Sequence, residues 1–156
     1  MKILGGNCTD MSSYSYFIHI PKTGGIAIKQ SSVLETRVEG FSKRNLPTNY
    51  TQRYENTTGR KGNHCHARWR DTGLSTKQPC FAIVRNPFAR MVSRYTYAMN
   101  KLNRPQKLSF EEFIETRHEH AHKEFNWHEA ADGWTTQKDY VVDTDNTLRC
   151  DVMRLE

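Results

Sequence analysis

Two short segments combine cations, hydroxyls and glycines in the way that anion-binding sites require. Residues 21–25 (PKTGG) follow an apolar stretch: Lys22 adds a positive charge, Thr23 a hydroxyl donor, and the glycines let backbone N–H groups approach a phosphate or sulfate. Arg85 follows a second apolar run, and Ser93 comes about two helical turns later. Each segment alone also fits an ordinary strand-to-helix turn with a surface cation. The two segments together are more specific for anion binding than either one alone.

Apolar runs and turn residues predict the elements that carry these segments. Strands are expected at residues 14–20, 63–69, 80–84, 141–142 and 148–153. Short helices are expected at 26–34 and 135–139. A further helix should begin at Pro87 with Asn86 as its N-cap, and another should run from the capping box Ser109-Phe110-Glu111-Glu112 towards Ala121. Residues 40–62 are polar and predict a long surface loop. In open α/β sheets ligands bind beyond the carboxyl ends of the strands, so the two cationic turns are expected to face one crevice.

The chain has 156 residues, which fits a single domain spanning 1–156. The elements predict a three-layer α/β domain with a short, mainly parallel sheet flanked by helices. The net charge of +6 favours anionic partners. No apolar run reaches membrane-spanning length and the first residues carry no signal-peptide pattern, so the chain is expected to be soluble and unexported. Its four cysteines lack CxxC pairing and are expected to be buried free thiols.

Two histidines are candidates for general-base chemistry. His64 and His66 are two residues apart, so on a strand they would share one face. An imidazole titrates near neutral pH and can accept a proton from a hydroxyl. Transfer of an anionic group to that hydroxyl depends on positioning and electrostatics, and we expect it to need no metal. The plainer interpretation is that both rings only make hydrogen bonds.

A rival pattern lies further along the chain. His118-Glu119-His120-Ala121-His122 matches H-E-x-x-H, and His128 stands where some zinc hydrolases have a third ligand. On a helix His118 and His122 would share a face, with Glu119 as the base. The glycine expected between the second and third ligands is Phe125 here, which disfavours this interpretation. A third alternative is a non-catalytic domain that binds polyanions through its net charge.

The paired segments resemble those of the carbohydrate sulfotransferases, particularly the branch that includes the uronyl 2-O-sulfotransferases. The segment Tyr16 to Gly25 resembles their 5′-phosphosulfate loop, and Val84 to Tyr95 resembles their 3′-phosphate box. Residues 62–67 (GNHCHA) are similar to a strand that supplies the base. Fainter similarity includes residues 109–113, Gln137 and residues 154–156. The resemblance implies a nucleotide-kinase-like (P-loop-kinase-like) core and a donor, 3′-phosphoadenosine 5′-phosphosulfate, that becomes 3′,5′-diphosphoadenosine.

The resemblance also assigns roles by position. Lys22 would meet the leaving phosphate and the sulfuryl group, and His66, or His64 as the close alternative, would be the base for a carbohydrate hydroxyl. Arg85 and Ser93 would hold the 3′-phosphate. The remaining donor-binding positions are Pro21, Thr23, Gly24, Gly25, Ile26 and Ala27.

Some features depart from the family pattern. Ile26 and Ala27 replace a Thr-Ser pair, which removes two hydroxyl donors and is expected to weaken donor binding. Glu156 comes where members usually continue into further helices, so we expect a minimal or a C-terminally truncated form, and catalytic competence is left open. Such relatives usually work in the Golgi lumen behind a membrane anchor.

Overall fold

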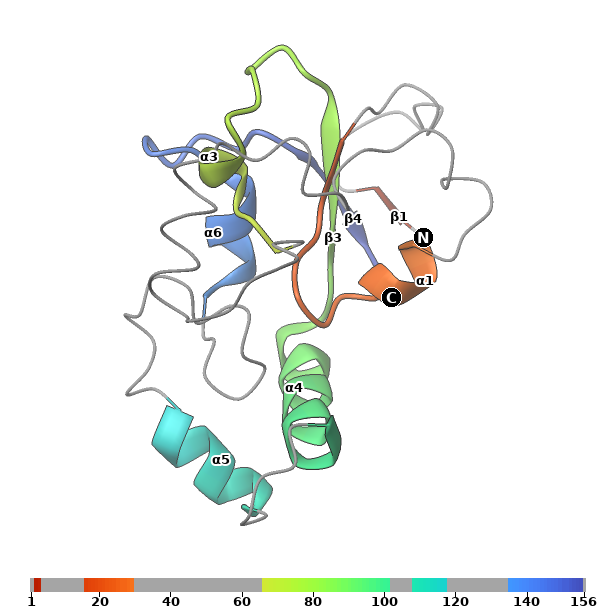
Figure 1. Ribbon diagram of the computed structural model, residues 1–156, viewed down its shortest axis with the longest axis vertical. Helices are drawn as coiled ribbons and strands as arrows, with labels where there is room; N and C mark the ends of the chain where they lie inside the picture. The colour runs from red at the N-terminus through yellow and green to blue at the C-terminus, as the bar shows by residue number, and fades with distance from the viewer. Residues whose placement is uncertain (1, 4–15, 30–65, 102–107, 118–134, 156) are drawn as a thin grey trace.

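The computed structural model describes residues 2–3, 16–29, 66–101, 108–117 and 135–155 (Figure 1). Its strands form one sheet in the order β1-β4-β3-β2, with bounds β1 Lys2–Ile3, β2 Tyr16–Ile18, β3 Cys80–Val84 and β4 Asp151–Arg154. Strands β2, β3 and β4 are parallel, and β1 pairs antiparallel with β4 at the edge. This sheet and its helices confirm the predicted α/β fold with a short, mainly parallel sheet.

The register brings the carboxyl ends of the three parallel strands to one edge of the sheet. Ile18 pairs with Ala82 in β3, and Val84 pairs with Arg154 in β4. The backbone N–H of Leu155 then donates to the Val84 carbonyl at 2.9 Å, which extends the β3–β4 pairing by one residue. The segments that follow β2, β3 and β4 therefore all leave the sheet at the same edge, as ligand binding in an α/β fold requires.

Both faces of the sheet are buried, as expected where helices cover a parallel sheet. One face contributes Ile18, Cys80 and Ala82 to a core that also contains Trp69 and Tyr140. The other face presents four side chains with no exposed surface: Phe17, Phe81, Ile83 and Met153. The rings of Phe17 and Phe81 have centroids 4.9 Å apart. Successive side chains of a strand point to opposite faces, so each strand contributes to both buried layers.

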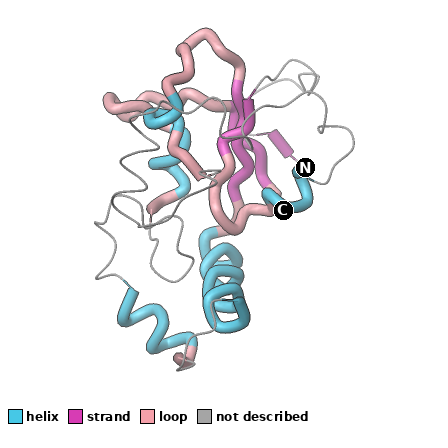
Figure 2. The backbone as a smooth tube through the Cα atoms, in the orientation of Figure 1, coloured by secondary structure: helices cyan, strands magenta, loops and turns pink. Residues whose placement is uncertain are grey.

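The helices are α1 Gly25–Lys29, α3 Trp69–Thr72, α4 Pro87–Lys101, α5 Phe110–Arg117 and α6 Gln137–Val141. Helices α3 and α6 lie together on one side of the sheet, and α1 is drawn on the other side (Figures 1 and 2). Helix α4 extends away from the carboxyl edge of β3, with α5 packed against it (Figure 2). None of the helices in the described ranges is long and apolar enough to cross a membrane.

Side-chain caps begin three of these helices. The Asn86 side-chain oxygen accepts from the backbone N–H groups of Phe88 and Ala89 at the start of α4, which confirms the predicted N-cap. Ser109 and Glu112 form the predicted reciprocal capping box before α5. Thr136 forms another capping box before α6, so the predicted short helix exists, displaced by two residues towards the C-terminus.

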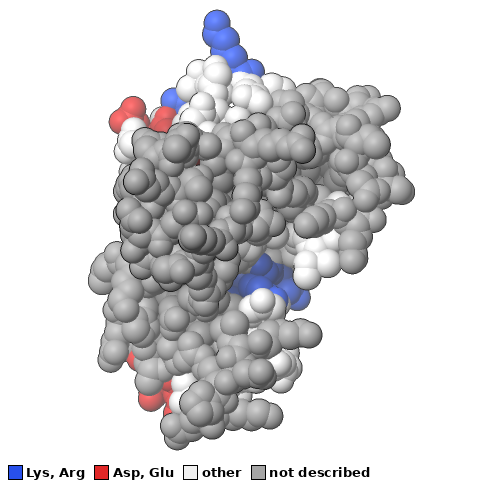
Figure 3. Space-filling model, viewed as in Figure 1, with Lys and Arg blue, Asp and Glu red and all other residues white. Residues whose placement is uncertain are grey.

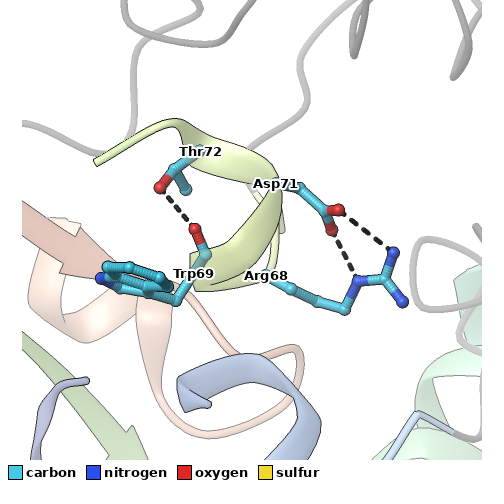
Figure 4. Close-up of polar contacts among 4 residues, drawn as sticks. All are labelled: Arg68, Trp69, Asp71 and Thr72. Carbon is cyan, nitrogen blue, oxygen red and sulfur yellow. Dashed lines mark hydrogen bonds and ion pairs between the residues drawn. The ribbon is translucent and has the colours of Figure 1, made fainter. Parts of the chain in front are cut away.

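The strand predicted at residues 63–69 is wrong over the part that the structure describes. Residues 67 and 68 have no regular structure, and Trp69 begins the one-turn helix α3 (Figure 4). Three local interactions favour the helical turn: Arg68 pairs with Asp71 at 2.6 Å, the Thr72 hydroxyl donates to the Trp69 carbonyl at 2.6 Å, and Gly73 ends the turn with a φ of 73°. Polar side chains that bond to nearby backbone compete with strand pairing.

The C-terminal predictions need smaller corrections. Val141 is the last residue of α6 rather than a strand residue, and Val142 forms only an isolated bridge with Leu148. The turn at 143–146 exists, and its Asp143 side chain accepts from the backbone N–H groups of Asp145 and Thr147. Strand β4 begins at residue 151, later than predicted. The loop 40–62 and residues 30–34 of the first predicted helix lie outside the described residues.

Candidate active site

The turn after β2 has a strained backbone that places Lys22 at the sheet edge. Lys22 has a φ of 67° and Gly24 a φ of 87°, so both are in the left-handed region. A non-glycine residue rarely adopts this conformation, and such strain gathers at functional sites. The Thr23 side chain is fully buried and its hydroxyl donates to the Ile20 carbonyl at 2.9 Å. Thr23 therefore stabilises the turn through this hydrogen bond.

Gly25 has a packing role that the sequence did not indicate. A Cβ atom at this position would lie 1.7 Å from Nε2 of His19, because the imidazole covers the glycine. A Cβ atom at Gly24 would have more room, because its nearest neighbour would be Cδ1 of Leu155 at 3.1 Å. The φ of 87° at Gly24 is the stronger restriction, since other residues rarely adopt it. The two glycines are thus required for different reasons: Gly24 for the turn and Gly25 for the close approach of the His19 ring.

One cleft collects most of the predicted site residues. Its volume is about 340 Å³, and it is lined by His19, Pro21, Lys22, Gly24, Gly25, Ile26, His66, Arg85, Ser93, Tyr97 and Leu155. A second, wider groove of about 530 Å³ adjoins it and is lined by Lys22, Arg85, Ala89, Val92, Ser93, Thr96, Tyr97 and Asn100. The two spaces share Lys22, Arg85, Ser93 and Tyr97. The glycine turn and the arginine turn therefore both line the first cleft.

The cleft is electropositive. Burial, followed by the charges of Arg85 and Arg94, lowers the pKa of Lys22 below its ordinary value. The Lys22 ammonium lies 4.2 Å from the centroid of the Tyr97 ring, which gives the cation an aromatic neighbour. Figure 3 shows Lys and Arg atoms in the hollow where the sheet edge meets the start of α4. Cations gathered in this way favour an anionic ligand.

Arg85 is held through its own backbone. The Gln137 side chain accepts from the Arg85 N–H at 2.9 Å and donates to the Arg85 carbonyl at 2.8 Å. This reciprocal pair joins the start of α6 to the residue that follows β3. The capping box of Thr136 and Asp139 fixes the first turn of α6 from which Gln137 extends. Gln137 therefore holds both the N–H and the carbonyl of Arg85 where the chain leaves β3.

A buried arginine of α4 connects the two turns. Arg90 donates through Nε to the Pro21 carbonyl at 3.1 Å, and through its terminal nitrogens to the Thr135 carbonyl at 3.3 and 3.4 Å. It is 7% exposed. Arg90 therefore couples the loop that carries Lys22 to the segment before α6, and a structural role accounts for its burial.

The histidines of the cleft form a close pair. The rings of His19 and His66 have centroids 4.2 Å apart, and Nδ1 of His66 lies 3.0 Å from the His19 carbonyl oxygen. A carbonyl can only accept, so this bond requires the proton of His66 to be on Nδ1. In the neutral ring Nε2 then carries the lone pair. His66 lies on a turn and not on the expected strand.

Several predicted residues are not in this arrangement. Ala27 is exposed and lines neither space. His64 lies outside the described residues, and so do His118, Glu119, His122 and His128 of the zinc alternative. Over the ranges that the structure describes, no group of three potential metal ligands occurs.

Sequence reasoning missed three residues of the cleft: His19, Tyr97 and Leu155. Tyr97 follows Ser93 by four residues on α4, and this helical spacing places both on one face. His19 immediately precedes the loop and alternates with Ile18 and Ile20, which both point into the core. Leu155 reaches the cleft only because β4 lies beside β3, and no local pattern signals that contact.

The fold and the cleft define an α/β domain with a cationic site at the carboxyl edge of a parallel sheet. A protein-family comparison matches residues 15–154 to the sulfotransferase family. The chain belongs to the sulfotransferase family. No curated protein and no solved structure gave a significant match.

Proposed function

We propose that this sulfotransferase takes its sulfuryl group from 3′-phosphoadenosine 5′-phosphosulfate and passes it to a hydroxyl of a carbohydrate. The observation that carries the proposal is the shared cleft: Lys22 and Arg85 come from turns far apart in the sequence and line the same space. A nucleotide with phosphate-type groups at both its 5′ and 3′ ends needs two separated cationic contacts. Members of the sulfotransferase family normally use such a donor.

The donor is held at its two ends. Lys22 neutralises the charge that grows on the 5′-phosphate as the bond to sulfur breaks, and the loop N–H groups of residues 24–26 assist it. Arg85 and Ser93 hold the 3′-phosphate, and Gln137 keeps Arg85 in place through the two backbone hydrogen bonds. Placing both ends fixes the sulfur atom in line with the acceptor, which supplies the positional part of catalysis.

His66 accepts the proton of the acceptor hydroxyl at Nε2. The acceptor oxygen forms a bond to sulfur, the bond between sulfur and the 5′-phosphate oxygen breaks, and 3′,5′-diphosphoadenosine leaves with the electron pair. The bond between Nδ1 of His66 and the His19 carbonyl supports this role, because it orients the ring and stabilises the imidazolium that forms. His64 is the alternative base.

The carbohydrate acceptor rests on the resemblance to the carbohydrate branch and on the net charge of +6. A cationic surface attracts acidic glycans by long-range electrostatics. The proposed partners are therefore the nucleotide donor and a glycan that carries carboxylate or sulfate groups.

Binding of the nucleotide is tested by thermal shift with 3′,5′-diphosphoadenosine, using adenosine 5′-phosphate as the matched ligand without the 3′-phosphate. We expect the diphosphate to raise Tm and the monophosphate to do so much less, because a ligand that binds only the folded state stabilises it. Equal shifts would contradict the assigned role of Arg85. Stabilisation by heparin with no response to either nucleotide would favour a polyanion-binding domain instead.

Transfer is tested with donor labelled on sulfur and a panel of neutral and acidic glycans. We expect label in an acidic glycan, and the His66→Ala variant should lose transfer while it keeps the thermal shift with 3′,5′-diphosphoadenosine. Undiminished transfer by His66→Ala would assign the base to another residue. Metal analysis of the same sample checks the zinc alternative, which requires stoichiometric zinc.

A further inference from the structure

The amino ends of β3 and β4 bring two cysteines together at the edge of the sheet opposite the candidate active site. Phe81 pairs with Asp151, so Cys80 and Cys150, each one residue earlier, are neighbours across the two strands. Their Sγ atoms lie 3.1 Å apart. Both residues are buried and neither is in a disulfide. The sequence alone predicted only unrelated buried thiols, because the two cysteines are 70 residues apart.

We propose that Cys80 and Cys150 form a disulfide when the protein meets an oxidising thiol–disulfide couple, such as glutathione with glutathione disulfide. Neighbouring parallel strands lie about 4.8 Å apart, within the range of Cα separations that a disulfide accepts. The sulfurs already point toward each other, so closure needs a movement of about 1 Å from their present separation to a bonded one.

A cleft lies beside the pair. It has a volume of about 280 Å³ and is lined by Thr76, Lys77, Gln78, Pro79, Cys80, Leu148, Arg149, Cys150 and Asp151. Both cysteines contribute to its wall, although each is almost fully buried, so an oxidant approaches the sulfurs from this side when the strand ends open locally. Lys77 and Arg149 also line it, and their charges suit the carboxylates of glutathione.

The exchange can begin at Cys80. Its thiol donates to the Cys150 sulfur and to the Arg149 carbonyl, each at 3.1 Å, and it becomes the attacking thiolate when its proton is lost. It attacks one sulfur of glutathione disulfide, and one glutathione leaves. The Cys150 thiol then loses its proton and attacks the Cys80 sulfur, which releases the second glutathione. Two protein thiols are oxidised, and one glutathione disulfide is reduced to two glutathione thiols.

The disulfide would join the two central strands of the sheet. It would close a segment that contains α4, α5 and α6, together with Arg85 and Gln137, and long closed segments restrict the unfolded chain strongly. We therefore expect the oxidised protein to have a Tm higher by roughly 5–15 °C. The candidate active site lies at the other end of the strands, so the affinity for 3′,5′-diphosphoadenosine should change less than twofold.

The test uses the full chain equilibrated in buffers with defined ratios of glutathione to glutathione disulfide, quenched with acid and alkylated. We expect the protein to lose two hydrogen atoms in mass, and peptide mapping should find Cys80 joined to Cys150. The Cys8→Ser/Cys65→Ser variant leaves only this pair and should oxidise in the same way. Mapping of the unchanged chain gives the answer even if that variant fails to fold.

Two matched variants sharpen the result. Cys80→Ser and Cys150→Ser each remove one sulfur, so the rise in Tm on oxidation should vanish in both, while the reduced proteins remain close in Tm to the reduced parent. The proposal is overturned if both thiols stay alkylatable at high glutathione disulfide, if glutathione stays attached to one of them, or if the only disulfides include Cys8 or Cys65. None of these outcomes depends on the proposed transfer reaction.

Discussion

The two ends of the central strands β3 and β4 differ in charge, backbone strain and openness. At the carboxyl end, Lys22 has a left-handed backbone, its ammonium is close to other cations, and a cleft opens beside it. At the amino end, Asp143 accepts from two backbone N–H groups and pairs with Arg149. Strain and like charges lower stability and create affinity for an anion, whereas satisfied hydrogen bonds stabilise the fold. The same pair of strands thus has a strained, cationic turn at one end and a stabilising, hydrogen-bonded turn at the other.

The largest expected effect is at the carboxyl end. Lys22→Ala should lower the turnover number by about 100- to 1,000-fold, because it removes the charge that stabilises the departing phosphate. Tm should change little, since the lysine is half-buried and the charges of Arg85 and Arg94 lower its pKa. Turnover is measured with labelled donor, and Lys138→Ala, an exposed lysine on α6, is the control. Unchanged turnover would remove Lys22 from the mechanism.

Next in size is the loss of the 3′-phosphate contact. Arg85→Ala should weaken binding of 3′,5′-diphosphoadenosine by roughly 10- to 100-fold, the range for a hydrogen bond to a charged group. Binding of adenosine 5′-phosphate should hardly change, and calorimetric titration measures both. Asp143→Asn is the matched control at the amino end: it should lower Tm and leave both affinities unaltered. If Asp143→Asn weakens nucleotide binding as much as Arg85→Ala, the two ends are not separate in function.

A substitution at Gly25 tests whether packing under His19 explains that glycine. Gly25→Ala places a Cβ against the imidazole and should lower the free energy of unfolding by about 1–3 kcal/mol. His19→Ala should relieve the clash, so the double variant should be more stable than additivity of the single changes predicts. Urea unfolding of the four proteins measures this coupling. Additive effects would mean that the ring does not restrict position 25.

A smaller effect is expected from the residue that holds Arg85 in place. Gln137→Ala should weaken 3′,5′-diphosphoadenosine binding about 3- to 10-fold, because the two bonds that fix the Arg85 backbone are lost while the guanidinium stays. In an Arg85→Ala background the same change should have almost no further effect on affinity. A full additional loss in that background would show that Gln137 acts independently of Arg85.

The smallest effect concerns pH. The pKa of Lys22 is lowered in the folded protein, so between that value and 10.5 the unfolded chain binds more protons, and stability rises with pH across this window. Lys22→Met removes the group. The Tm of Lys22→Met relative to the parent should therefore fall as pH increases towards 10.5, by ~1 °C in total. Scanning calorimetry at a series of pH values measures it, and a difference that grows with pH would contradict the lowered pKa.

Local sequence was sufficient for the elements that begin with strong caps or consist of uninterrupted apolar residues. Strand β3 matched its prediction, and helix α4 began at Pro87 with Asn86 as its cap. The strand predicted at residues 63–69 was wrong because the Arg68–Asp71 pair and the Gly73 turn favour a helical turn there. Those interactions are short in range but depend on side-chain geometry, which a pattern of residue types does not specify.

The two cationic turns, Lys22 after β2 and Arg85 after β3, could be predicted from local sequence, because charge, glycine and apolar runs are properties of neighbouring residues. The shared cleft, the His19 imidazole over Gly25 and the contact of Cys80 with Cys150 became visible in the folded structure. These contacts join residues from different strands. They follow from the parallel register of the sheet, which is set by the packing of the whole core and not by any one segment.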